Sequence, residues 1–134
     1  MLYEIFGKYV DKIYVYECSN QGGENSFASL IEDGVVLSKK MKAGATVPCD
    51  MVFNRLHVTA EGYMDACCVD MSNYLAIADL HSVSLEDAWN SDEFKELRRK
   101  HLTGKIAGTQ CFNCVHIAET SVKPLNEKLV NLCN

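Results

Sequence analysis

Apolar and aromatic side chains recur at helical spacing at the start of the chain. In the first ten residues they stand three or four positions apart, which predicts a helix over residues 2–10. The β-branched and aromatic run 13–16 predicts a short strand after that helix. Residues 25–48 are weakly patterned and indicate a connector with little regular structure. A helix, a strand and a connector do not make a convincing domain by themselves.

Two strand-like runs on either side of a glycine turn predict a β-hairpin in the middle of the chain. Residues 52–58 form the first run and residues 63–69 the second. Glu61-Gly62 between them is a turn signal. A loop is expected from the end of the hairpin through Asp79.

Serine residues ahead of two apolar-periodic stretches predict two helix starts further along. Ser84, with Asp87 three residues on, can cap a short helix. Ser91 can cap a second helix over residues 92–102, and Gly104 supplies its stop. The inward-facing side chains of this second helix are expected to be Phe94, Leu97 and Leu102.

The end of the chain predicts a loop and then a last helix. Residues 111–114 are expected in the loop, and residues 122–132 place leucines on one side of a helix. A small hairpin combined with several helices gives an α+β fold class.

Composition describes an ordinary globular protein rather than a fibrous or disordered one. The 134 residues are 48% hydrophobic and 23% charged, enough for one compact domain or one small domain plus a piece of another. The formal charge of −5 argues against broad binding to nucleic acids or anionic membranes. The one basic cluster, residues 98–101, is interpreted as the solvated end of a helix. His57, His81 and His101 are interpreted as surface or hydrogen-bonded histidines rather than functional ones.

Cysteine is the residue type that needs a special explanation. No stretch is as apolar as a membrane span, and the first residues lack the features of a signal peptide, so a cytoplasmic location is expected. Seven cysteines in a reducing compartment indicate metal or redox chemistry rather than disulfides.

Four of the cysteines can converge on one centre. Cys111 and Cys114 are close enough for both sulfurs to turn inward on the same metal. Cys49 lies before the first predicted hairpin strand and Cys67 at the end of the second, so pairing would bring both to the same end of the hairpin. Four thiolates suit a [4Fe–4S] cluster and equally a tetrahedral zinc site. Spacing alone leaves iron and zinc both open.

A set of short motifs resembles the SPASM/twitch accessory domain of radical SAM enzymes over roughly residues 46–116. The set comprises Cys49-(x)17-Cys67-Cys68-Val69-Asp70, Ser84-Leu85-Glu86-Asp87-Ala88-Trp89-Asn90-Ser91, Leu97-Arg98 and Cys111-x-x-Cys114. Each piece alone is a weak signal, whereas the set is specific.

The resemblance implies one auxiliary [4Fe–4S] cluster bound by the four matching cysteines. It favours Cys67 over Cys68 as the third ligand, because of the spacing from the turn glycine Gly62. Adjacent strand residues point to opposite faces, so Cys68 is the alternative to Cys67 rather than a fifth ligand. Cys18 and Cys133 have no matching position and are interpreted as core or surface thiols.

The resemblance also implies what lies outside these residues. The Cys-x-x-x-Cys-x-x-Cys motif of the radical SAM barrel is absent from the sequence, so this fragment is not expected to catalyse the reaction itself. S-adenosylmethionine and a second cluster would belong to the missing catalytic domain of a parent oxidoreductase, maturase or other modifying enzyme. Residues 1–45 would then be the tail of a partial α/β barrel and its linker, residues 46–120 the cluster domain, and residues 121–134 a C-terminal helix or tail.

Electron transfer or substrate positioning is the expected role of such a cluster. The expected partners are the catalytic domain of the same enzyme and a peptide or protein substrate. The alternative from a different class is a zinc-stabilised module, in which the same four thiolates close a tetrahedral zinc site and the fold binds a protein or peptide.

Overall fold

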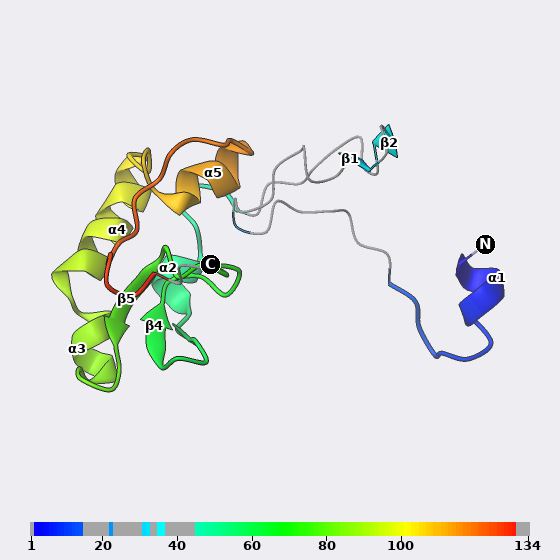
Figure 1. Cartoon of the computed structure of the whole chain (residues 1–134), viewed down its shortest axis with the longest axis horizontal. Coiled ribbons are helices and arrows are strands. Elements are labelled where there is room, and N and C mark those ends of the chain that lie inside the picture. The colour runs from blue at the N-terminus through cyan, green and yellow to red at the C-terminus, as the bar shows by residue number, and fades with distance from the viewer. Residues whose placement is uncertain (1, 15–21, 23–30, 33–34, 37–44, 131–134) are drawn as a thin grey trace.

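The structure of the chain is a computed structural model that describes residues 2–14, 22, 31–32, 35–36 and 45–130 (Figure 1). It has the expected α+β class. Its helices are α1 (Leu2–Phe6), α2 (Met51–Asn54), α3 (Leu85–Trp89), α4 (Asp92–Thr103) and α5 (Gln110–His116). Its strands are β1 (Ile31–Glu32), β2 (Val35–Val36), β3 (His57–Val58), β4 (Tyr63–Asp65) and β5 (Ala76–Asp79). No described helix is long and apolar enough to cross a membrane.

An antiparallel sheet in the order β3-β4-β5 forms the middle of the cysteine-bearing part of the chain. The expected hairpin is confirmed, because β3 pairs with β4 in the register His57↔Asp65. Gly62 takes a positive φ of 85° at the turn, a conformation that glycine adopts without strain. The Thr59 hydroxyl accepts a hydrogen bond from the Tyr63 N–H and closes the turn.

The first hairpin strand is much shorter than residues 52–58, and that prediction was wrong for its first half. Residues 51–54 form the helix α2 instead. The Asp50 carbonyl accepts the N–H groups of Phe53 and Asn54, and the Asp50 carboxylate accepts the Asn54 side-chain amide. Val52 is fully buried in the core. Local hydrogen bonds and one buried side chain therefore override the β propensity of this run.

The loop expected through Asp79 contains a third strand that the pattern did not reveal. β5 pairs with β4 in the register Tyr63↔Asp79, with an irregularity between Met64 and Asp65. Its residues Ala76 and Ile77 are buried. The run from Leu75 to Ala78 is continuously apolar rather than alternating, so it carries no period-2 signal.

Both serine caps are confirmed. The Ser84 hydroxyl accepts the Asp87 N–H at 3.1 Å, and the Ser91 hydroxyl accepts the Phe94 N–H at 3.3 Å. Gly104 ends α4 in the left-handed conformation with φ 69°.

The buried face of α4 differs from the expected one at its last position. Phe94 and Leu97 are buried as expected, whereas Leu102 is 69% exposed. The third inward residue is His101, only 1% exposed, because it stands seven positions after Phe94 and shares its face. The basic cluster is accordingly not wholly solvated, since His101 is buried and Arg98 is half-buried.

The end of the described chain also differs from the expectation. Residues 111–114 are helical, within α5, and residues 122–130 contain no helix. The segment instead runs back across the domain, where Lys123 N–H binds the Gly108 carbonyl and Leu125 N–H binds the Tyr74 carbonyl. Figure 1 shows this segment returning past α4 to the sheet. Residues 131 and 132 of the predicted helix lie outside the described residues.

The core lies between the sheet and helices α2 to α4. Among its fully buried side chains are Val52, Met64, Ala66, Leu75, Ile77, Ala88, Phe94, Leu97 and Ile106. Trp89 packs on this core partly buried and meets Phe94 edge to face at 5.2 Å.

The first part of the chain has a different character. α1 covers only residues 2–6 of the predicted helix and has no buried residue. Residues 13 and 14 are not in a strand, and the rest of that predicted strand lies outside the described residues. Within the predicted connector, β1 and β2 pair antiparallel.

Candidate iron–sulfur site

The structure supplies cysteines to one site from three separate segments. Cys111 and Cys114 stand three positions apart on α5, so they share one helix face, and both are buried. Cys67 follows β4, and Cys49 precedes α2. Cys18 and Cys133 lie outside the described residues.

Electrostatic coupling shows that these segments meet. Burial, with smaller contributions from the neighbours Cys67, Cys49 and Cys114, raises the pKa of the Cys111 thiol to about 12. Burial likewise raises the pKa of Cys67 to about 12, with added contributions from Cys68, Asp65 and Cys114. Cys49, Cys67 and Cys114 therefore lie in the neighbourhood of Cys111, although Cys49 is far from Cys111 and Cys114 in sequence.

The chemistry of this donor set suits a metal cluster. Cys49, Cys67, Cys68, Cys111 and Cys114 are thiols rather than disulfides. At neutral pH the buried thiols with raised pKa values hold their protons, and binding to iron would displace those protons. Among the described residues, no three His, Cys, Asp or Glu side chains are gathered tightly enough to hold a single metal ion.

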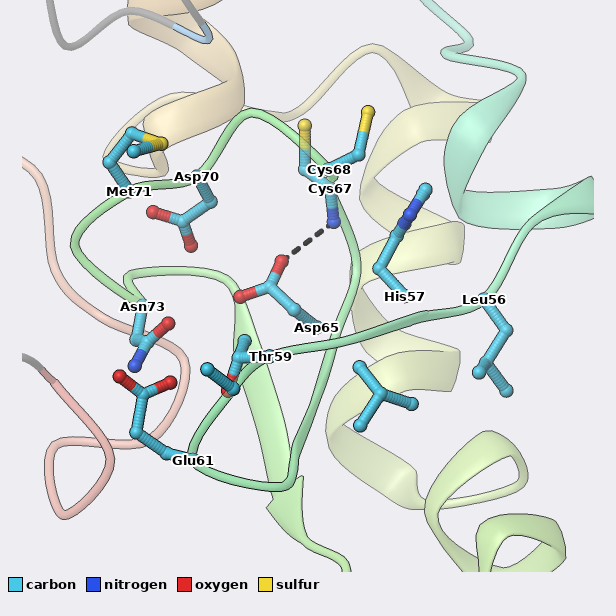
Figure 2. Close-up of a pocket in the computed structure, with 12 residues that line it drawn as sticks. Leu56, His57, Thr59, Glu61, Asp65, Cys67, Cys68, Asp70, Met71 and Asn73 are labelled. Carbon is cyan, nitrogen blue, oxygen red and sulfur yellow. Dashed lines mark hydrogen bonds between the residues drawn. The ribbon is translucent and has the colours of Figure 1, made fainter.

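A buried carboxylate shapes the loop that carries Cys67. The Cys67 N–H donates to Asp65 Oδ1 at 2.7 Å, as Figure 2 shows. The Asp70 N–H donates to the Cys67 carbonyl at 3.3 Å, and the Asp70 carboxylate accepts the Leu75 N–H. Asp70 is the acid of the Cys-Cys-x-Asp motif, so its structural role is to close the turn after the cysteine pair.

Exposure distinguishes the two adjacent cysteines. Cys67 is partly buried and packs against the core, whereas Cys68 is exposed. The neighbours that act on Cys111 include Cys67. Cys67 is therefore the member of the pair that lies near Cys111, and Cys68 is the more exposed one.

Cys49 is held from α4 rather than from its own segment. Its N–H donates to His101 Nδ1 at 3.2 Å, and the two residues are 52 positions apart. The interpretation of His101 as a hydrogen-bonded histidine holds, but sequence reasoning missed its link to a site cysteine. The spacing of His101, four residues from Leu97 and seven from Phe94, could have placed it on the buried face of α4, but not against Cys49.

A cleft of about 500 Å³ lies beside the cysteine pair (Figure 2). Its walls come from the β3–β4 turn and from the loop that follows β4. Cys67 and Cys68 both line it, and so do the carboxylates Asp65 and Asp70. His57 also lines it, and burial together with Arg55 lowers the pKa of this histidine. The cleft gives a small molecule or a side chain access to the immediate surroundings of Cys67.

A small α+β domain in which cysteines from three segments converge defines a class of thiolate-bound metal domains. Comparison with protein families identifies which one: residues 49–115 match the SPASM family, described as an iron–sulfur cluster-binding domain, and the chain belongs to that family. No curated protein and no solved structure matches the chain. The match begins at Cys49 and ends one residue after Cys114.

Family membership makes iron rather than zinc the metal that the site is built for. The residues present fit an iron–sulfur cluster, because buried thiols are the donors that such clusters use. The zinc-stabilised interaction module is not favoured.

Proposed function

We propose that this chain carries one auxiliary [4Fe–4S] cluster for a radical SAM enzyme, with Cys49, Cys67, Cys111 and Cys114 as its ligands. The observation that supports the proposal most directly is that Cys49, Cys67 and Cys114, from three segments, all lie close enough to Cys111 to raise the pKa of its thiol, in a chain that belongs to an iron–sulfur family. Four thiolates are the number that such a cluster takes.

Full ligation by cysteine would leave no iron open to substrate, so it points to electron transfer or a structural role, with substrate positioning left to the protein around the cluster. When bound, the cluster would supply one-electron chemistry at a potential set by burial and by hydrogen bonds around its sulfurs. The chain's own part is to bury two of the thiols on α5, to fix the Cys67 loop through Asp65 and to hold Cys49 from α4. The cleft beside Cys67 is where a substrate group would come nearest to this centre.

The surrounding architecture is part of the same proposal. Residues 46–120 form the cluster domain, residues 1–45 lead into it from a radical SAM barrel, and residues 121–134 close it. The catalytic domain binds S-adenosylmethionine and its own cluster, and the substrate is a peptide or protein modified in the cytoplasm. The exposed apolar side chains of residues 2–14 support this arrangement, because such side chains normally pack against another surface.

Anaerobic reconstitution with iron and sulfide tests the proposal. The wild-type chain is expected to take up about four irons and four sulfides, and Cys111→Ser and Cys114→Ser are each expected to lower both counts. An electron-paramagnetic signal after reduction would establish a redox-active cluster. Stoichiometric zinc without sulfide would contradict the proposal and restore the interaction module.

A further inference from the structure

Two hydrogen bonds join residues 49–52, here called the Cys49 segment, to helix α4, and the bonded residues are three positions apart on each side. Cys49 and Val52 are three residues apart on one segment, and His101 and Arg98 are three residues apart on the other. His101 Nδ1 accepts the Cys49 N–H at 3.2 Å, and Arg98 Nε donates to the Val52 carbonyl at 2.9 Å. The two contacts span a sequence gap of 52 and 46 residues respectively.

Arg98 is fixed by more than its bond to Val52. Its Nη1 donates to the Trp89 carbonyl at 2.9 Å, so one guanidinium bridges two backbone carbonyls from different elements. The guanidinium also stacks on aromatic rings, 4.2 Å from the Trp89 centroid and 3.8 Å from the Phe94 centroid. A planar fork that satisfies two carbonyls while stacking is a task for arginine and not for lysine.

Burial and one hydrogen bond constrain the ring of His101. It is 1% exposed, and because Nδ1 accepts a hydrogen bond, the proton of the neutral ring lies on Nε2. Because the buried His101 accepts a hydrogen bond from the backbone N–H of Cys49, it fixes the orientation of the Cys49 backbone and so the direction of its side chain.

We propose that His101 and Arg98 are positioning residues that fix Cys49 for the cluster from outside its own segment. Cys49 lies in neither a helix nor a strand, whereas Cys111 and Cys114 are held by α5. We call the two hydrogen bonds that join His101 and Arg98 to the Cys49 segment the clamp. The clamp holds Cys49 in place, as helix α5 holds Cys111 and Cys114. Outer residues of this kind commonly change metal affinity about 10- to 100-fold when they are replaced. The expected effect on the cluster rests on the proposed function. The expected effect on the position of Cys49 rests only on the hydrogen bonds described above.

Two substitutions at His101 separate positioning from packing. His101→Leu fills much of the space but removes the acceptor, whereas His101→Asn leaves a void but places an oxygen near the position of Nδ1. The clamp predicts that a chelator removes iron from the reconstituted His101→Leu chain about 10- to 100-fold faster than from wild type, with partial rescue in His101→Asn. A packing role predicts the opposite order, with His101→Asn the worse of the two.

Arg98→Lys tests the second point of the clamp against a matched neighbour. Lysine keeps the charge but cannot bond both carbonyls, so iron loss from Arg98→Lys is expected to accelerate. Arg99→Lys is the control, because Arg99 is exposed and pairs with Glu96 rather than with the Cys49 segment. Equal iron loss from the two lysine variants would overturn the proposal for Arg98.

Amide exchange in the metal-free chain keeps this test separate from the cluster. The Cys49 N–H is expected to exchange slowly in wild type, faster in His101→Leu and at an intermediate rate in His101→Asn. Reconstitution that fails in wild type while this order holds would overturn the proposed function and leave the clamp supported. Exchange at Cys49 that is the same in all three chains would overturn the clamp, whatever the iron content.

Discussion

Two parts of the chain both carry apolar side chains at helical spacing but place them in very different surroundings. In residues 2–14, Leu2, Ile5 and Phe6 belong to a helix without a single buried residue. In residues 45–130, equivalent side chains such as Phe94 and Leu97 are almost wholly enclosed. Hydrophobic periodicity therefore predicts that one face of a helix is apolar, but it does not predict which surface packs against that face. The core and every described cysteine belong to the second part.

The largest expected effect is a difference in stability between two phenylalanine-to-alanine variants, one from each part of the chain. Phe94→Ala should lower the free energy of unfolding by about 3–5 kcal/mol, because Phe94 is 0% exposed and its removal leaves a cavity. Phe6→Ala should change it by less than about 0.5 kcal/mol, because Phe6 is 50% exposed. Urea unfolding of both variants gives the two values. Similar losses would mean that α1 packs on the rest of the chain, and the contrast between the two parts would be false.

A smaller effect is expected at the helix caps. Ser84→Ala removes the acceptor for the Asp87 N–H and the donor to its carboxylate, and should cost about 1 kcal/mol. Ser91→Ala removes one cap bond, to Phe94, and should cost a similar amount or less. The same unfolding measurement applies. A loss at Ser84 as large as that at Phe94 would show that α3 contributes far more than its short length indicates.

The smallest effect on stability is expected from removing residues 1–44. A chain that starts at residue 45 keeps the sheet, α2 to α5 and the core, so its melting temperature should stay within a few degrees of the full chain. Its iron and sulfide uptake should also be unchanged. Loss of cluster uptake on truncation would show that residues 1–44 contribute to the site.

The sequence predicted the elements whose signals are local. Ser84, Ser91 and Gly104 act on their own helices, and Gly62 acts on its own turn, so their roles follow from the residues beside them. β5 was missed because the run from Leu75 to Ala78 is continuously apolar and carries no alternation. α2 was mistaken for a strand because its hydrogen bonds to Asp50 and the burial of Val52 decide its form.

The same division holds at the site. Cysteine spacing and family resemblance predicted Cys49, Cys67, Cys111 and Cys114 as the site, and the first two and the last lie close enough to Cys111 to raise the pKa of its thiol. The helix that carries Cys111 and Cys114 was not expected, because the pair's composition gives no periodic signal. The contact of His101 with Cys49 could not be predicted, since it joins residues 52 positions apart and depends on how α4 docks.

The central claim is that Cys67, and not its neighbour Cys68, completes a four-cysteine iron–sulfur site. The most direct test is anaerobic reconstitution of Cys67→Ala and Cys68→Ala beside wild type, with iron and sulfide counted per chain. We predict about four of each for wild type and for Cys68→Ala, and a clear loss for Cys67→Ala. Full uptake by Cys67→Ala with loss in Cys68→Ala would contradict the claim.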